Sequence, residues 1–203
     1  MTDRLNVLVL ESEVGAADEA RRELEEAGHH VVGCHKRGED AFPCAGLHDE
    51  RHCPLDEVVD VALDVRPRPR SQPAPREDGV ACALRQHIPL VIAGPAVLNP
   101  YDDYAQSTIN RTYDVVDACE RAATAPLRDH TSAAARALRD VLDRRRVDAT
   151  PLVAVRRRDG VLLIEVSRAE NVDHATRSMA AVRMAGAVRA LDHYARGCDV
   201  VFS

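Results

Sequence analysis

The stretch NVLVLESE at residues 6–13 points to the fold class, because a short apolar run gives way at once to acidic and polar residues. Residues 6–10 predict a buried strand, and AADEARRELEEA at 16–27 predicts an amphipathic helix that Gly28 ends. Outward from this pair, the same patterns predict strands at 30–34, 58–65 and 89–93 and helices at 78–86 and 112–123. Strands that alternate with helices favour a parallel sheet covered on both faces.

A second pattern begins after Pro126, which interrupts an otherwise helical stretch. The order predicted there is helix, strand, strand, helix, strand, over residues 132–146, 151–157, 161–167, 172–195 and 199–202. Asp159-Gly160 lies between the first two strands and is typical of a type I′ hairpin turn, because glycine accepts the positive φ that this turn requires. We therefore predict two domains, residues 1–125 and 126–203, the second a small α+β domain whose antiparallel or mixed sheet has two helices on one face.

Composition and charge exclude several classes of function. Residues 1–130 carry 24 acidic and 14 basic side chains, whereas residues 131–203 carry 9 and 13, and the net charge of −6 argues against general nucleic-acid binding. Two Phe, four Tyr and no Trp leave few aromatic rings for stacking single-stranded bases. The longest apolar run, residues 89–98, is too short to span a bilayer, and acids follow the first apolar run directly. We therefore expect a cytoplasmic protein that binds neither nucleic acid nor membrane.

Several motifs within residues 5–123 are similar to those of a response-regulator receiver domain. RGEDAF at 37–42 resembles the run that opens the second helix of that family, and LDVRP at 63–67 resembles its phosphoacceptor turn. DGVACALRQHIPLVIAG at 78–94 resembles its third helix and fourth strand. The resemblance implies an α/β fold with a flavodoxin-like parallel sheet.

The resemblance also implies a role for three acids. Asp64 stands at the phosphoacceptor position, where a carboxylate at a strand end attacks a phosphoryl donor. Glu11 and Glu13 stand at or next to the positions that hold Mg²⁺, which neutralises the phosphoryl oxygens.

The chain departs from the receiver pattern at the residues that respond to the phosphate. Ser12 replaces one of two adjacent acids, and the position of the switch hydroxyl falls on Gly94 or a neighbour that is also neither Ser nor Thr. Lys36 is the only lysine, so the lysine that reads the phosphate after the fifth strand of the family is missing. Residues 99–111 are too short for a full fourth helix and a fifth strand. We expect a degenerate receiver scaffold that works through protein contacts, and the alternative is a working phosphoacceptor. A further interpretation makes Asp60, Asp64 and the glutamates solvated acids at strand ends.

The segment RPRPRSQPAP at 66–75 is dense in proline and arginine. Such a composition is incompatible with a helix or an inner strand. We therefore predict an extended surface loop there.

The second domain resembles BON domains over residues 132–202. DGVLLIEVSRAENVDHATRSMAAVRMAGAVRAL at 159–191 shares the Asp-Gly turn, the alternating Val and Leu and the alanine-dense helix of that family. The family's glycine in the second strand is absent, since Ile164-Glu165 stands there. The resemblance implies a binding or assembly module without catalytic residues, and the alternative is an unrelated small α+β dimerisation domain.

Cysteines and histidines gather between the second and third predicted strands: Cys34, Cys44, His48, His52 and Cys53. Thiolate and imidazole are the ligands that Zn²⁺ prefers, so these five residues are candidate zinc ligands. A disulfide of Cys44 with Cys53 or Cys34 is an alternative, as is a loop whose cysteines pack underneath it and whose histidines face solvent. The remaining cysteines are expected to be small core residues: Cys82, Cys119 and Cys198.

Motifs of common enzymes are missing from the sequence. The glycines are too widely spaced for a dinucleotide-binding loop, and no Gly-x-Ser-x-Gly elbow is present. We therefore expect a non-enzymatic regulatory protein that binds another protein and forms a homodimer, with a helix at 112–123 or 172–195 at the interface. No cofactor is expected, and the alternatives are Mg²⁺ at the acids or Zn²⁺ at the Cys/His loop.

Overall fold

The computed structural model describes residues 4–35, 41–48, 53–110 and 114–203. The chain divides into two compact units, Met1–Ala123 and Thr124–Ser203. Neither unit, in the residues described, has a helix that combines the length and apolar character needed to cross a membrane.

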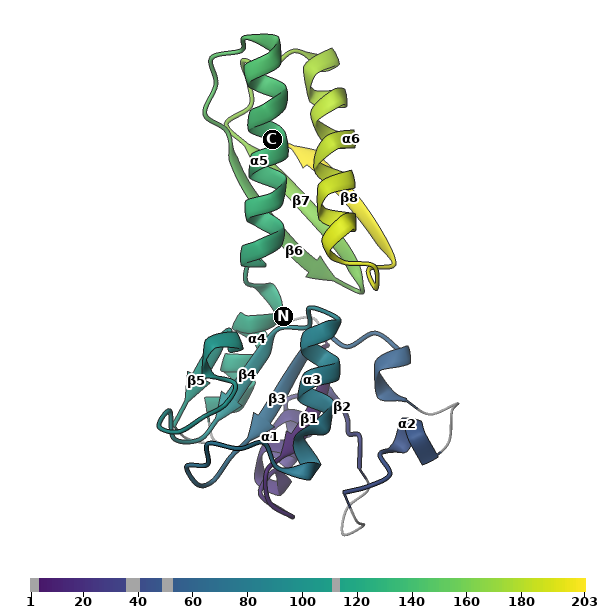
Figure 1. The fold of residues 1–203 in the computed structure, drawn as a ribbon, viewed down its shortest axis with the longest axis vertical. Coiled ribbons are helices and arrows are strands. Elements are labelled where there is room, and N and C mark those ends of the chain that lie inside the picture. The colour runs from purple at the N-terminus through teal and green to yellow at the C-terminus, as the bar shows by residue number, and fades with distance from the viewer. Residues whose placement is uncertain (1–3, 36–40, 49–52, 111–113) are drawn as a thin grey trace. The chain divides into compact units, whose positions relative to one another are not determined.

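The first unit is built on a five-stranded sheet in which every pair of neighbouring strands is parallel (Figure 1). Its strands are β1 (Asn6–Glu11), β2 (His30–Val32), β3 (Val61–Val65), β4 (Leu90–Ala93) and β5 (Ser107–Ile109). The order across the sheet is β2-β1-β3-β4-β5, which is compatible with a flavodoxin-like core. The prediction of an α/β unit with a parallel sheet is therefore confirmed.

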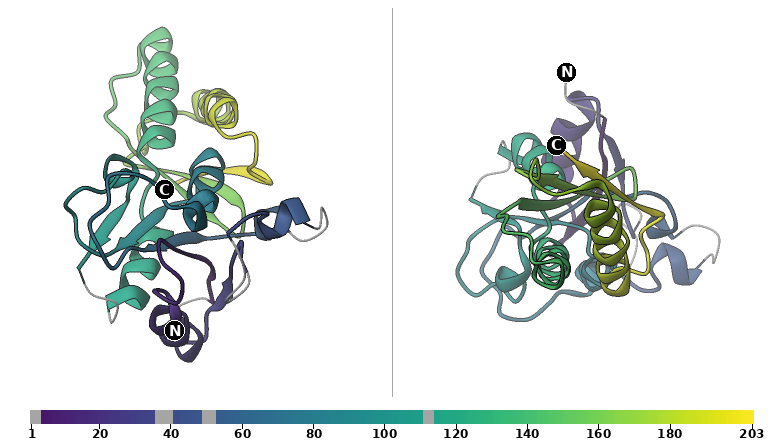
Figure 2. Two further views of the ribbon diagram at one scale, coloured as in Figure 1. Left: turned by 60° about the horizontal axis from the view of Figure 1, so that its bottom comes forward. Right: turned by 90° about the horizontal axis from the view of Figure 1, so that it is seen from above.

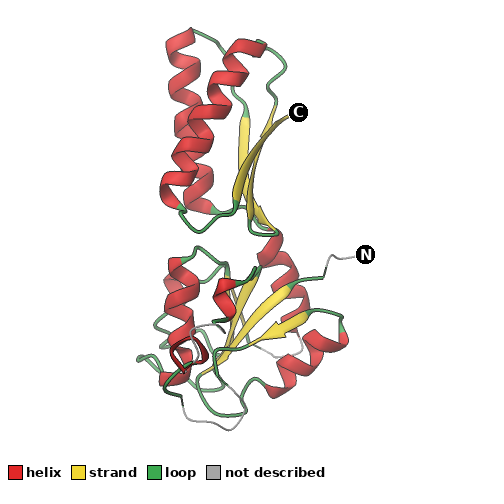
Figure 3. Cartoon of the chain, turned by 90° about the vertical axis from the view of Figure 1, so that its right-hand side faces the viewer, coloured by secondary structure: helices red, strands yellow, loops and turns green. Residues whose placement is uncertain are grey.

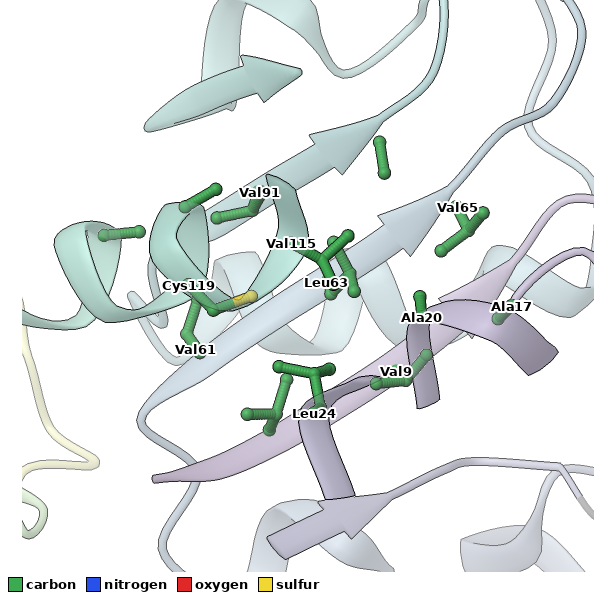
Figure 4. Packing of buried hydrophobic residues seen from close by; sticks show 14 of the residues in the cluster. Val9, Ala17, Ala20, Leu24, Val61, Leu63, Val65, Val91, Val115 and Cys119 are labelled. Carbon is green, nitrogen blue, oxygen red and sulfur yellow. The ribbon is translucent and has the colours of Figure 1, made fainter. Parts of the chain in front are cut away.

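Helices cover both faces of this sheet. The longer ones are α1 (Asp18–Glu26), α3 (Asp78–Arg85) and α4 (Val115–Thr124). One face packs against α1 and α4, and Figure 4 shows Leu24 and Cys119 meeting the side chains of β1 and β3 there. The other face packs against α3. Short elements complete the unit: α2 (Ala45–His48) and the 3₁₀ turns η1 (Pro54–Asp56), η2 (Pro75–Glu77) and η3 (Asp102–Tyr104).

The segment between β4 and α4 differs in part from the prediction. The place of a full helix is taken by η3, a single 3₁₀ turn, as the short spacing of 99–111 suggested. A fifth strand is nevertheless present, because one turn uses so few residues that three remain to pair with β4.

The second unit has the predicted αββαβ order. Its elements are α5 (Arg128–Arg145), β6 (Leu152–Arg158), β7 (Val161–Ser167), α6 (His174–Leu191) and β8 (Gly197–Phe202). β7 pairs antiparallel with β6 and parallel with β8, so the sheet is mixed. Both helices pack on the same face of this sheet (Figures 2 and 3). Asp159 and Gly160 have φ of 51° and 76°, which confirms the predicted turn with two positive φ values.

Both helices of the second unit differ from the prediction at their ends. α5 begins at Arg128, before the predicted start at 132, and the Thr131 hydroxyl within it accepts the Val155 N–H. α6 is shorter than predicted. Its N-cap is Asp173, which accepts the Thr176 N–H at 3.0 Å, and it ends at Leu191.

Candidate functional site

The ends of β1 and β3 carry the acids that the sequence singles out. Glu11 is the last residue of β1, and Asp64 is the last but one of β3. The two strands are neighbours at the point where the strand order reverses, and open α/β sheets bind ligands at such a point. The register places Asp64 opposite Leu10, so the side chains of Glu11 and Asp64 leave opposite faces of the sheet. The acids share an edge without forming one acidic pocket.

Asp64 is fully buried and lies beside an equally buried arginine. The Arg66 Nη1 atom is 2.5 Å from Glu77 Oε1 and 3.8 Å from Asp64 Oδ2. Neither oxygen of Asp64 accepts a hydrogen bond from an N–H group within the described part of the chain. Burial raises the pKa of Asp64 well above its ordinary value, the negative charge of Glu77 raises it further, and Arg66 offsets only part of the increase. Burial and Glu77 therefore favour the protonated form of Asp64 more than in an exposed aspartate.

Arg66 is enclosed by the segment that follows it and by Tyr101, which follows β4. Its Nη2 atom donates to the Arg70 carbonyl at 2.8 Å, and its guanidinium lies 5.6 Å from the centre of the Tyr101 ring. Glu77 in turn accepts the Ala74 N–H at 2.5 Å through its second carboxylate oxygen. Only 1% of the Arg66 surface remains exposed, so the guanidinium occupies the interior of the loop as a fixed internal cation.

The two predicted metal-binding glutamates also lie beside arginines. Glu11 Oε1 is 3.1 Å from Arg76 Nε and 3.0 Å from Arg76 Nη2, and Glu11 Oε2 accepts the Ala17 N–H at 3.2 Å. Glu13 is partly exposed, and its Oε1 atom is 3.7 Å from Nε of Arg68. Each of the three acids therefore has an arginine from the segment between β3 and α3.

This arrangement corrects two sequence-based interpretations. The segment 66–75 is an exposed loop from Pro67 to Pro73, but the prediction is wrong for Arg66 and Ala74, which are buried. The interpretation as solvated acids is wrong for Glu11 and Asp64, because both are buried. A carboxylate that loses water needs a cation or donor nearby, and the arginines meet that need for Glu11.

Backbone packing closes the same edge at the position predicted for the switch hydroxyl. Gly94 follows β4 with φ of +154°, and a Cβ atom built there would lie 1.9 Å from the Arg66 carbonyl oxygen. The Arg66 N–H donates to the Ala93 carbonyl at 2.8 Å, so the two chain segments approach too closely for any side chain at Gly94. A serine or threonine hydroxyl has no room at this position.

The residues at this edge do not fit Mg²⁺ as they are arranged. Mg²⁺ needs ionised, accessible oxygen ligands in near-octahedral geometry. Asp64 is buried with a raised pKa, and both oxygens of Glu11 already accept hydrogen bonds. A buried carboxyl group whose pKa is raised is also a poorer nucleophile toward a phosphoryl donor than an exposed carboxylate.

The Cys/His loop is only partly described. Cys34 is buried in the apolar cluster between the sheet and α3, and Cys44 and Cys53 pack partly against that cluster. Burial, with the nearby thiols of Cys53 and Cys44, raises the pKa of Cys34 to about 12, which disfavours the thiolate that Zn²⁺ binds. The predicted ligands also include His52 and the His48 side chain, which lie outside the described residues, as do residues 37–40. Among the residues that are described, no group of three or more His, Cys, Asp or Glu could hold a metal ion. Zinc binding stays a prediction.

The other three cysteines have different environments. Cys119 is fully buried in the core of the first unit, as expected. Cys198 packs partly against the core of the second unit. The prediction for Cys82 is wrong, because α3 turns Val80 and Ala83 toward the sheet and leaves Cys82 exposed.

A second buried charged cluster lies in the second unit. Asp192 follows α6 and is fully buried, with His130 Nε2 of α5 3.4 Å from its Oδ2 atom. Arg157 of β6 also pairs with Asp192, and the Tyr194 N–H donates to its other oxygen at 3.0 Å. Burial opposes the charge of Asp192, but the contact with His130 and the charge of Arg157 lower its pKa below the ordinary value. The sequence gives no sign of this cluster, because its members are far apart along the chain.

Searches of protein-family models, curated proteins and solved structures found no match to this chain. The fold and the contacts described above are therefore the basis for a functional assignment.

Proposed function

We propose that this protein is a non-enzymatic regulatory or scaffolding protein. Residues 1–125 form a degenerate receiver-like domain, residues 126–203 form a small BON-like domain, and the protein acts through protein contacts as a homodimer. The strand order of the first unit and the αββαβ order of the second support the two resemblances.

The position of Arg66 is the observation that carries this proposal. A receiver changes state when a phosphoryl group and a divalent cation alter the charge around its phosphoacceptor. Here a buried guanidinium lies beside both the Asp64 and Glu77 carboxyl groups, at 3.8 and 2.5 Å. The loop therefore has an internal cation, and its conformation does not depend on a phosphoryl group or a bound metal.

The surface around this edge is suited to protein contacts. The ion pair of Arg68 with Glu13, at 3.7 Å, links the loop after β3 to the loop after β1. The Arg70 N–H donates to the Leu98 carbonyl at 3.2 Å and links it to the loop after β4. Exposed aliphatic side chains lie on these loops: Val14, Val97 and Leu98. These three side chains are exposed aliphatic groups that a partner protein could cover.

Phosphoryl transfer gives a direct test of the proposal. The full-length protein is incubated with acetyl phosphate and Mg²⁺, and its intact mass is followed with time. We expect no gain of a phosphoryl group, because Asp64 is fully buried beside Arg66 and a phosphoryl donor has no access to it. A phosphoryl adduct that forms on the wild type and is lost in Asp64→Asn would overturn the proposal and establish the alternative, a working phosphoacceptor.

Native mass spectrometry of the untagged protein tests the remaining alternatives. We expect a dimer whose mass equals that of two chains. A zinc-sized excess that disappears in Cys44→Ser would instead favour a metal sensor centred on the Cys/His loop. A disulfide whose reduction changes the oligomeric state would favour a redox sensor.

A further inference from the structure

A groove of about 280 Å³ lies in the second unit, between α5, the connection that follows it and the start of β6. Its apolar lining comes from Ala135, Leu138, Leu142, Val147, Ala149, Pro151 and Val153. Leu138 and Leu142 also belong to the core of the unit, so this part of the groove is a rigid surface. A volume of this size accepts one large aliphatic side chain with its flanking backbone.

The rim of the groove is charged. Arg139 and Asp143 of α5 and Asp148 of the connection are the charged residues that line it, and all three are exposed. Two carboxylates against one guanidinium give the rim an excess of negative charge. Charge complementarity therefore favours an occupant that places a lysine or arginine beside its aliphatic group.

The β6 side of the groove offers backbone hydrogen-bonding groups. The Val155 N–H donates to Thr131 Oγ1 at 3.0 Å, and its carbonyl accepts the Leu127 N–H at 2.7 Å, so both groups point away from β7. Backbone groups alternate in direction along an antiparallel strand, so Val153, two residues earlier, also directs its N–H and carbonyl away from β7. Val153 lines the groove, and within the described part of the chain these two groups have no hydrogen-bond partner.

Other residues of the chain limit how many residues of a bound peptide can pair with the edge of β6. At Val155 the β6 edge is already closed by Leu127 and Thr131. On the other side Pro151 has no N–H to donate. The open edge of β6 therefore consists of the N–H and carbonyl of Val153 alone. Two such groups can align a short extended peptide, but they are too few to add a full strand.

We propose that this groove binds a short extended peptide of another protein, with a large aliphatic side chain on Leu138 and Leu142 and a basic side chain beside Asp143 and Asp148. The peptide pairs with the outward N–H and carbonyl of Val153, which sets its direction. This inference rests on the proposed function in protein binding and assigns one contact to the second unit.

Nuclear magnetic resonance of the full-length, ¹⁵N-labelled protein tests the inference with defined probes. The first probe is acetyl-Ser-Lys-Leu-Lys-Ser amide, and the two controls replace both lysines by glutamate or the leucine by serine. We expect the lysine–leucine peptide to shift the Val153 amide resonance with a dissociation constant on the order of 1 mM, since the contact is small. Each control should bind at least about tenfold more weakly.

Matched variants locate the contact. Asp143→Asn with Asp148→Asn should weaken binding about tenfold, whereas Asp140→Asn, an exposed acid of α5 that does not line the groove, should leave it unchanged. Ala135→Leu fills the groove from α5 and should abolish the shift, and Arg136→Leu is its control outside the groove.

The outcomes separate this inference from the proposed function. Absence of a Val153 shift with every peptide, or equal binding by the glutamate and lysine peptides, would overturn the groove assignment and leave the proposal for the first unit intact. A concentration-dependent Val153 shift without peptide would identify a second copy as the occupant and would also overturn it. Phosphorylation of Asp64, in contrast, would overturn the proposed function without affecting the groove.

Discussion

Asp64 in the first unit and Asp192 in the second are both fully buried, and each lies beside an arginine. Their ionisation nevertheless shifts in opposite directions. The pKa of Asp64 is raised, by burial and then by Glu77, whereas the contacts of Asp192 outweigh its burial and lower its pKa. A nearby arginine is therefore not enough to keep a buried carboxylate ionised.

The difference between the two aspartates lies in their hydrogen bonds. Asp192 Oδ1 accepts the N–H groups of Tyr194 and Ala195 at 3.0 and 3.1 Å, while Oδ2 faces His130 and Arg157. Asp64 accepts no hydrogen bond from an N–H group among the described residues, since the Arg66 guanidinium is directed at Glu77, and its hydrogen bond with the Glu77 carboxyl group favours the protonated form. N–H donors directed at the carboxylate oxygens, as at Asp192, stabilise the ionised form of an aspartate. A cation that is shared with a second acid, as Arg66 is shared between Asp64 and Glu77, stabilises it less.

The largest expected effect comes from removing the internal cation of the first unit. Arg66→Ala leaves Glu77 buried without its partner, and loss of one member of a buried ion pair costs about 3–5 kcal/mol. Urea unfolding, with hydrogen exchange of β3 and α3 to identify the unit, measures this loss. Arg68→Ala removes an exposed arginine of the same loop and should change the free energy of unfolding by less than about 1 kcal/mol. Equal effects of the two variants would contradict the role given to Arg66.

A second change tests whether backbone packing closes the same edge. Gly94→Ala places a methyl group 1.9 Å from the Arg66 carbonyl oxygen, so β4 and the loop after β3 must separate. We expect a loss of about 3 kcal/mol in the unfolding free energy of the first unit. Gly186→Ala is the control, since nothing lies within 4 Å of a Cβ atom there and the helix should become slightly more stable.

Replacing the two aspartates by asparagine compares them directly. Asp192→Asn removes the charge that Arg157 and His130 contact, and we expect a loss of about 2 kcal/mol in the second unit. Asp64→Asn removes a group whose raised pKa disfavours its charge, so the first unit should change by less than about 1 kcal/mol at neutral pH. Hydrogen exchange of the full-length variants reports on each unit. A larger loss in Asp64→Asn than in Asp192→Asn would refute the comparison.

The smallest effect is the pH dependence of stability, which has opposite signs in the two units. The raised pKa of Asp64 means that its contribution is full below its unfolded pKa of about 3.9 and is lost as the pH rises through the folded value. The lowered pKa of Asp192 means that its contribution is full above about 3.9 and is lost as the pH falls through the folded value. Each slope is at most about 1.4 kcal/mol per pH unit. The corresponding asparagine variant should abolish each slope in its own unit.

Much of the fold could be predicted from local patterns. The run at 6–10, the helix before Gly28 and the Asp159-Gly160 turn all appear near their expected positions. Alternation of apolar residues and turn chemistry act over a few residues, so they can be recognised without knowledge of distant contacts.

Whether the residues of the candidate site are buried and paired could not be predicted from the sequence. These properties depend on side chains that are distant along the chain or that leave different faces of the sheet. That Asp64 and Glu11 lie at the same edge follows from parallel strands, but the strand register sends their side chains to opposite faces. Arg66 belongs to a proline-rich stretch that is typical of an exposed loop, and it is buried only because Glu77, Arg70 and Tyr101 surround it.

Local pattern thus predicted most strands and helices of this chain and the Asp159-Gly160 turn, but not β5, and it predicted which acids stand at the strand ends. Whether those acids are charged, covered or open to a ligand depended on long-range packing, as did the pairing of His130 with Asp192 across 62 positions of the chain. The physical reason is that backbone conformation responds to neighbouring residues, whereas the ionisation of a buried group depends on every donor, charge and water that the folded chain places around it.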